Sequence, residues 1–188
     1  MMPGATAGSS PDESSTFLHW SSRGLITSRR LYEDEDQYVA EIEHYAEDSV
    51  TARTERITTT EPYAVACLGP HGAFFGRNDV DRNSSLSYHP IGSWDANGAW
   101  SAELPAGEAV ECVAAGEDWV AALTSRAFLR LYSIGGVCDA VVSLPGQTVS
   151  AVAKDRWLAV AFHCSAAFGQ YESQEVAVAV YGVQAGWR

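Results

Sequence analysis

The sequence offers one group of side chains that could act as a nucleophile and its base. His163 directly precedes Cys164, and Asp155 lies a short distance upstream. A cysteine nucleophile needs a thiolate, an oriented base and a donor for the developing oxyanion. Neighbouring side chains on a strand point to opposite faces of the sheet, so His163 and Cys164 would not meet. The sequence therefore predicts no catalytic residue, and we expect a protein that is not an enzyme.

Metal and cofactor sites are not indicated either. The histidines show neither H-x-x-x-H nor H-E-x-x-H spacing, and no two cysteines form a C-x-x-C pair. Gly135-Gly136 stands between two predicted strands with no helix after it, so we interpret it as a turn and not as a phosphate-binding loop. The acidic run Glu33 to Asp36 is expected to be a solvated loop. We predict no metal ion and no cofactor. The five histidines are His19, His44, His71, His89 and His163.

Composition excludes several classes of protein. The chain has 188 residues, of which 46% are hydrophobic, and 12 basic against 24 acidic residues give a net charge of −12. Such an acidic chain would not hold DNA through its overall field, since that binding needs cations against phosphates. No apolar run approaches the roughly 18 residues that cross a bilayer. We therefore expect no membrane span and no direct DNA binding by this segment.

The ends and the cysteines indicate a reducing compartment. Residues 1–15 are rich in Gly, Ser, Pro and Ala and have no apolar core, so they predict a disordered leader and not a signal peptide. Cys67, Cys112 and Cys138 lie in apolar or alternating segments, where a free thiol packs as a small hydrophobic side chain. We expect buried free thiols and no disulfide framework.

From Thr16 onward the pattern is that of an all-β protein. Short runs of β-branched and aromatic residues alternate with turn signals, and no amphipathic helix stands out. In residues 37–45, Ala40 and Ile42 share one face while Glu41 and Glu43 share the other. Asn97-Gly98 predicts a hairpin, because both positions tolerate a positive φ. The predicted strands cover residues 17–20, 24–27, 37–45, 109–115, 119–124, 127–133, 137–144, 149–153, 157–163 and 175–181.

A repeat organises these strands. Residues 111–123 match residues 150–161, each being an apolar strand, a short polar turn, a tryptophan and a second apolar strand. Residues 63–75 form a third copy, in which Phe74 takes the place of Trp119 and Trp157. A unit of about 40 to 45 residues with about four strands is the size of a β-propeller blade. We expect the tryptophans to pack between blades; a surface for stacking carbohydrate or bases is the alternative.

The length has room for about four such blades, so we predict three to four blades of an incomplete propeller over residues 16–188. A β-sandwich is the competing architecture, although it would not require an aromatic residue after each turn.

The sequence resembles the middle propeller of the replisome-adaptor family that includes the minichromosome-loss and chromosome-transmission-fidelity proteins and the animal WD-repeat and HMG-box DNA-binding protein. The most specific segment is Leu129 to Val137, LRLYSIGGV. Ser93-Trp94-Asp95 and the segment Phe17 to Ile26 are also similar, and weaker agreement around residues 64–75 joins them. The resemblance covers most of residues 16–182.

This resemblance implies a six-bladed propeller, of which the chain would form about half, within a non-enzymatic nuclear scaffold. Members of the family are homotrimeric hubs that couple the replicative helicase assembly to DNA polymerase alpha on chromatin. Their clients dock on a helical bundle that this sequence does not contain, so the resemblance assigns no partner-binding residue. A small propeller or sandwich that binds a ligand or carbohydrate is the alternative function.

Overall fold

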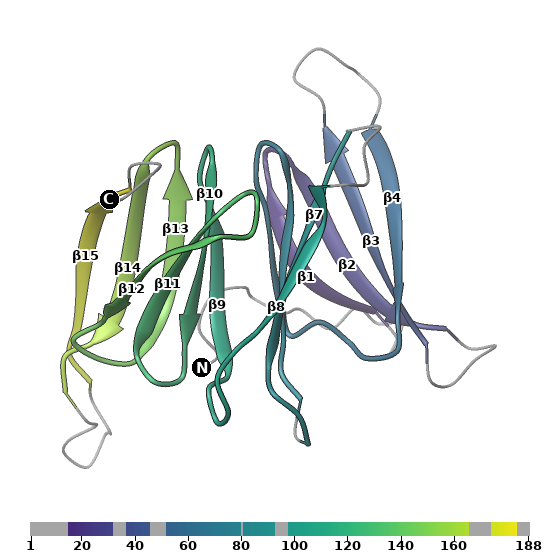
Figure 1. Ribbon diagram of the computed structural model, residues 1–188. Coiled ribbons are helices and arrows are strands. Elements are labelled where there is room, and N and C mark those ends of the chain that lie inside the picture. Colours follow the sequence, from purple (N-terminus) through teal and green to yellow (C-terminus); the bar gives the residue numbers. More distant parts are fainter. Residues whose placement is uncertain are drawn as a thin grey trace.

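The structure is a computed structural model, and it describes residues 15–31, 37–45, 52–79, 81–92, 98–165 and 174–183. These residues form four separate antiparallel sheets, each a meander of strands that follow one another in sequence. Figure 1 shows the sheets side by side, from β15 on the left to β4 on the right. We name them sheets A to D in chain order. The predicted all-β class is confirmed.

The strands have the following bounds. Sheet A contains β1 (Ser15–Ser21), β2 (Gly24–Arg30), β3 (Tyr38–Tyr45) and β4 (Ala52–Thr59). Sheet B contains β5 (Val65–Leu68), β6 (Gly72–Arg77), β7 (Ser85–Pro90) and β8 (Trp100–Glu103). Sheet C contains β9 (Val110–Ala115), β10 (Trp119–Thr124), β11 (Phe128–Ser133) and β12 (Cys138–Ser143). Sheet D contains β13 (Thr148–Lys154), β14 (Trp157–His163) and β15 (Val176–Gly182).

Consecutive sheets meet through their first strands, which we call the inner strands. β1 contacts β5, β5 contacts β9, and β9 contacts β13. A sandwich would instead place two large sheets face to face. Four small meanders arranged around adjacent inner strands are blades of a propeller, so the propeller prediction is confirmed for the described residues.

One backbone hydrogen bond recurs in every sheet and defines the repeat. The N–H at the end of the third strand, or one residue beyond it, donates to a carbonyl in the turn between the first and second strands. The next residue along from that carbonyl is Gly24, Gly72, Trp119 or Trp157. Gly72, and not Phe74, is therefore the counterpart of Trp119, which corrects the register of the third copy. The bonds are Tyr45 to Arg23 (2.8 Å), Ile91 to His71 (3.0 Å), Ile134 to Asp118 (3.3 Å) and Val183 to Arg156 (2.7 Å).

The core lies between the sheets, in three clusters. Ile26 and Ile42 of sheet A pack with Phe75 of sheet B, and Phe74 packs with Val120 of sheet C. The third cluster joins sheets C and D. Because sheets B and C are covered on both faces, every residue of β10 is buried. Leu131 and Tyr132 lie on opposite faces of β11, and both are buried. Alternation along the strand would by itself predict only one buried face.

Most predicted strands agree with the structure, and three observed strands were not predicted. β4, β7 and β8 lie outside every strand range given in the sequence analysis, although β8 follows the predicted Asn97-Gly98 hairpin. β4 is a polar outer strand with the sequence ARTERITT, and it lacks the apolar alternation that marks a half-buried strand. Asn97 of the predicted hairpin, the acidic run 33–36 and the leader up to residue 14 lie outside the described residues.

Candidate functional site

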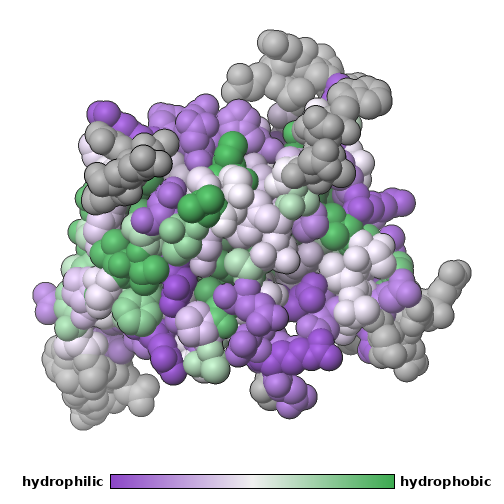
Figure 2. Space-filling view, in the orientation of Figure 1, coloured by the Kyte–Doolittle hydropathy of each residue, from purple (hydrophilic) through white to green (hydrophobic). Residues whose placement is uncertain are grey.

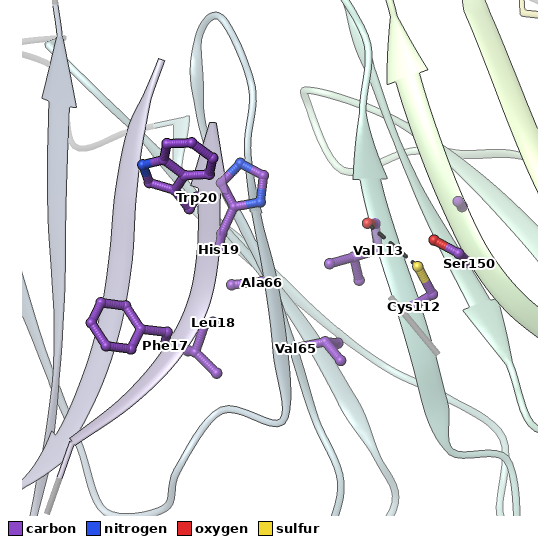
Figure 3. A pocket seen from close by; sticks show the side chains of 10 residues that line it. Phe17, Leu18, His19, Trp20, Val65, Ala66, Cys112, Val113 and Ser150 are labelled. Carbon is purple, nitrogen blue, oxygen red and sulfur yellow. Dashed lines mark hydrogen bonds between the residues drawn. The ribbon is translucent and has the colours of Figure 1, made fainter. Parts of the chain in front are cut away.

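The inner strands of all four sheets border one cavity of about 310 Å³. Figure 3 shows its two sides. Phe17, His19 and Trp20 come from β1, where an irregular register between Phe17 and His19 interrupts the pairing with β2. Cys112 of β9 and Ser150 of β13 lie on the opposite side.

The polar groups of this cavity are uncharged at neutral pH. Burial lowers the pKa of His19 below the ordinary histidine value, so its imidazole is neutral. Its Nε2 atom is buried and has no hydrogen-bond partner among the described residues. Burial raises the pKa of Cys112 to about 11, so this side chain stays a thiol and is not an activated nucleophile. The cavity suits apolar or neutral groups and carries no charged pair for acid–base chemistry.

The structure keeps the candidate catalytic residues apart. Asp155 lies in the turn before β14 and His163 is the last residue of that strand, so about 20 Å of strand separates them. The Cys164 side chain is exposed. In the described ranges no group of three or more His, Cys, Asp or Glu side chains could hold a metal ion. Gly135-Gly136 forms the turn between β11 and β12, with a φ of 86° at Gly136.

The cysteines divide into two classes, and one prediction about them is wrong. Cys67 and Cys112 are buried as expected, but Cys138 is exposed together with Cys164. Cys138 begins the outer strand of sheet C, where alternation along the strand does not imply burial on either face. All four are free thiols.

Thiol reactivity should follow this division. We expect a water-soluble disulfide reagent at pH 8 to modify Cys138 and Cys164 rapidly, and to modify Cys67 and Cys112 only after denaturation. Burial raises the pKa of both protected thiols, which suppresses the reactive thiolate. Time-resolved titration with peptide mapping measures the effect; four equally fast thiols would contradict the described core.

The tryptophans do not share one environment. Trp119 is 4% exposed, and its indole N–H donates to the Asp155 carbonyl of the next sheet at 3.1 Å. Trp100 is half-buried between sheets B and C. Trp20 and Trp157 are 80% and 49% exposed and belong to the two terminal sheets. Packing between sheets therefore describes Trp119 and Trp100 but not the other two.

Comparison with known protein families gives a match that covers nearly the whole chain. The family described as the middle region of the minichromosome loss protein Mcl1 matches residues 1–187. The chain belongs to this family. The resemblance drawn from LRLYSIGGV and the other segments is thereby confirmed.

Individual proteins are also similar to this chain over most of its length. The human WD repeat and HMG-box DNA-binding protein 1 is 31% identical over 153 residues, which cover 81% of this chain and 13% of the human protein. The Xenopus laevis protein of the same name is 27% identical over 148 residues. The Arabidopsis thaliana protein ENHANCER OF LHP1 1 is 34% identical over 176 residues, or 87% of this chain and 17% of that protein. The chain thus spans less than a fifth of the length of these relatives.

Two findings bear on the expectations that the protein is not an enzyme and has no membrane span. The matching family is described by a region of the minichromosome loss protein and by no reaction, and the catalytic candidates Asp155, His163 and Cys164 are not brought together in the described residues. In the same residues, no helix has the length and the apolar character that crossing a bilayer would require.

Proposed function

We propose that this chain is a protein–protein interaction module of a nuclear replisome adaptor. The observation that carries the proposal is the family match over residues 1–187. The geometry supports this proposal. The first and the last described sheets, A and D, each have a face that no other described sheet covers, and the cavity between the inner strands is uncharged. The described sheets contain no reactive centre. Its partners would be the replicative helicase assembly and DNA polymerase alpha, and as part of the adaptor it would act on chromatin within a homotrimer.

Charge supports contact with proteins and not with DNA. The chain carries a net charge of −12, and its single lysine is Lys154. Protein interfaces depend on packed apolar contacts with a polar rim, whereas phosphate contacts need clustered cations. We therefore expect the chain itself not to bind duplex DNA at physiological salt.

A binding experiment tests the role. The purified chain is mixed with purified helicase assembly or DNA polymerase alpha, and complex formation is followed by analytical ultracentrifugation at micromolar concentration. We expect a complex with at least one of them, and none with a 30-base-pair duplex at about 150 mM salt. A folded chain that binds neither protein, or that binds the duplex, would overturn the proposal. A glycan array on the same sample would detect the alternative carbohydrate-binding activity.

A further inference from the structure

The outer edge of sheet C is an unpaired strand. β12 pairs with β11 on one side, and no other described strand lies along its second side. Cys138, Asp139, Val141 and Ser143 of this strand are exposed, and Val137 directly before it is 62% exposed. Figure 2 shows hydrophobic residues on the near face at the left, in the region where Figure 1 draws β12. Such an edge presents free backbone donors and acceptors to another strand.

The register shows which backbone groups of β12 point outward. Leu144 donates its N–H to the Ala127 carbonyl at 2.7 Å, so these two residues form a hydrogen-bonded pair. Bonded and non-bonded pairs alternate along an antiparallel ladder. Val142 is therefore bonded to β11, whereas Val141 and Ser143 turn their N–H and C=O groups away from it. The edge thus offers the backbone groups of both residues to a further strand.

The other outer strands are protected or incomplete. Natural edge strands are commonly kept from pairing by charge, shortness or proline. β4 carries Arg53, Glu55 and Arg56 along its length, and β8 has four residues and is followed closely by Pro105. β15 is the edge of the three-stranded sheet D, where a further strand would only complete the four-stranded repeat. β12 already completes a sheet of four strands, so a strand added there is not part of the repeat.

A bulge confines the free edge to the second half of β12. The register with β11 shifts between Cys138 and Ala140, where Asp139 is the extra residue. A bulge bends and twists an edge and ends regular pairing. From Ala140 to Ser143 the strand contains neither a charged residue nor a proline. An incoming strand can therefore pair with Val141 and Ser143, but a long ladder cannot form.

The charge beside the free edge selects the incoming segment. Asp139 is exposed and has no ion pair among the described residues. Arg130 lies opposite Val141 on β11, but it is already bonded to Glu108 at 2.7 and 2.8 Å. Asp139 and Val141 share a face, because they lie two positions apart on the strand. A segment with an apolar residue and, two positions along, Arg or Lys would match both side chains.

A second copy of the chain fits this edge less well than a basic segment. Each copy carries a net charge of −12, which opposes self-association and favours a basic partner. Two β12 edges paired with each other would share only the short stretch beside the bulge, whereas a stable interface buries at least about 1,200 Å² in total. A short extended segment that binds transiently needs no such area.

We propose that the free edge of β12 binds an extended segment of a partner protein as a fifth strand of sheet C. The segment has apolar residues at alternate positions and a basic residue that lies against Asp139. Backbone hydrogen bonds to Val141 and Ser143 supply the affinity, and the side chains of Val141 and Asp139 supply the selectivity. This surface deepens the proposed role as an interaction module and rests on it, but its test uses no replication protein, so the two can fail separately.

Titration of the isotope-labelled full chain with short peptides, followed by NMR, tests the edge. The probe is the acetylated and amidated peptide TVTVTRT, whose valines and arginine lie on one face of an extended strand. TVTVTET reverses its charge, and TVTVTRT with N-methylated valines lacks the donors that would face Val141 and Ser143. We expect the amide signals of Val141 and Ser143 to shift with TVTVTRT, and its dissociation constant to be about threefold lower than that of TVTVTET. The methylated peptide should leave these signals unchanged.

Two variants of the chain locate the contact. Val141→Pro removes one outward N–H and leaves the bonds to β11 intact, so we expect it to weaken TVTVTRT binding at least about tenfold. Val141→Thr is the matched control, since it keeps the N–H and the branched shape, and it should change binding by less than about threefold. Asp139→Lys serves if the proline variant does not fold, because it leaves the backbone unchanged and should reverse the order of the two charged peptides.

Two results would overturn the proposal. The first is equal binding of the methylated and unmethylated peptides, or no shift of the Val141 and Ser143 amides with any peptide, since no strand would then pair with the edge. The second is a shift of these amides that grows with protein concentration alone, together with a dimer by ultracentrifugation, since a second copy would then be the occupant.

Discussion

Replacing Arg130 by methionine is expected to lower the free energy of unfolding by about 3–5 kcal/mol at pH 7. Arg130 donates two hydrogen bonds to the Glu108 carboxylate, at 2.7 and 2.8 Å. The Glu108 side chain is 1% exposed and that of Arg130 is 15% exposed. Removing the guanidinium leaves a buried carboxylate without its hydrogen-bonded countercharge, which costs far more than the net value of the pair.

The pH dependence distinguishes this cause from lost packing. The hydrogen bonds from Arg130 hold the pKa of Glu108 below its usual value. The stability this adds is present above the unfolded pKa and is lost as pH falls through the folded pKa. In Arg130→Met, burial instead raises the pKa of Glu108, so the variant gains stability as pH falls. The difference between the two proteins should therefore shrink from pH 7 to pH 4.5.

Urea unfolding followed by tryptophan fluorescence measures both effects. Arg126→Met is the matched control, because Arg126 is an exposed arginine that donates a hydrogen bond to the Ala106 carbonyl at 3.3 Å and acts on Glu108 only through its charge; its loss should stay within about 0.5 kcal/mol. Glu108→Gln serves if Arg130→Met does not fold, since the amide keeps one acceptor for Arg130. A difference that grows as pH falls would contradict the account.

The strands that could be predicted best from the sequence have one apolar, buried face and one polar face. β3 shows its alternation directly, with Ala40 and Ile42 buried toward sheet B. β4 could not be recognised because it lies at the outer edge of its sheet and is mostly exposed, so its polar residues carry no periodic signal. β7 is short and ends in His89-Pro90, which argues locally against a strand.

The register of the third repeat was mispredicted for a reason that sequence spacing does not show. In sheet C the indole of Trp119 fills the space beside its own turn. In sheet B that strand position is Gly72, and the Tyr88 ring from the neighbouring strand occupies the space, so that an added Cβ at Gly72 would lie 2.6 Å from it. An aromatic ring therefore fills this space in both sheets. In sheet C the ring belongs to the second strand, and in sheet B it belongs to the third strand.

The residues of the candidate site could not be predicted from sequence motifs either. The residues around the cavity come from four inner strands spread from Phe17 to Ala151, and their types are those of ordinary strands. The pairing of Glu108 with Arg130 has no spacing rule, since one lies in a loop before β9 and the other on β11. Only the meander order, in which each first strand is the inner one, brings such residues together.

Trp100→Ala is expected to lower the free energy of unfolding by about 3 kcal/mol, at the lower end of the range for large aromatic truncations because the residue is half-buried. The Trp100 ring packs with those of Phe74, Tyr88 and Tyr132, with centroid separations of 5.5 to 6.0 Å. Its indole N–H donates to the Ile134 carbonyl of sheet C at 2.9 Å. One side chain therefore joins sheets B and C by stacking and by a hydrogen bond.

Two further variants separate these contributions. Trp100→Phe keeps an aromatic ring and removes the donor, so the carbonyl of Ile134 loses one partner at a cost of about 1 kcal/mol. Trp157→Ala is the matched control, because Trp157 is 49% exposed on the side of sheet D that points away from sheet C, and its truncation should cost less than about 1 kcal/mol. If Trp157→Ala proved as costly as Trp100→Ala, the Trp157 side chain would have to be buried. That result would contradict the exposed position of Trp157 on sheet D.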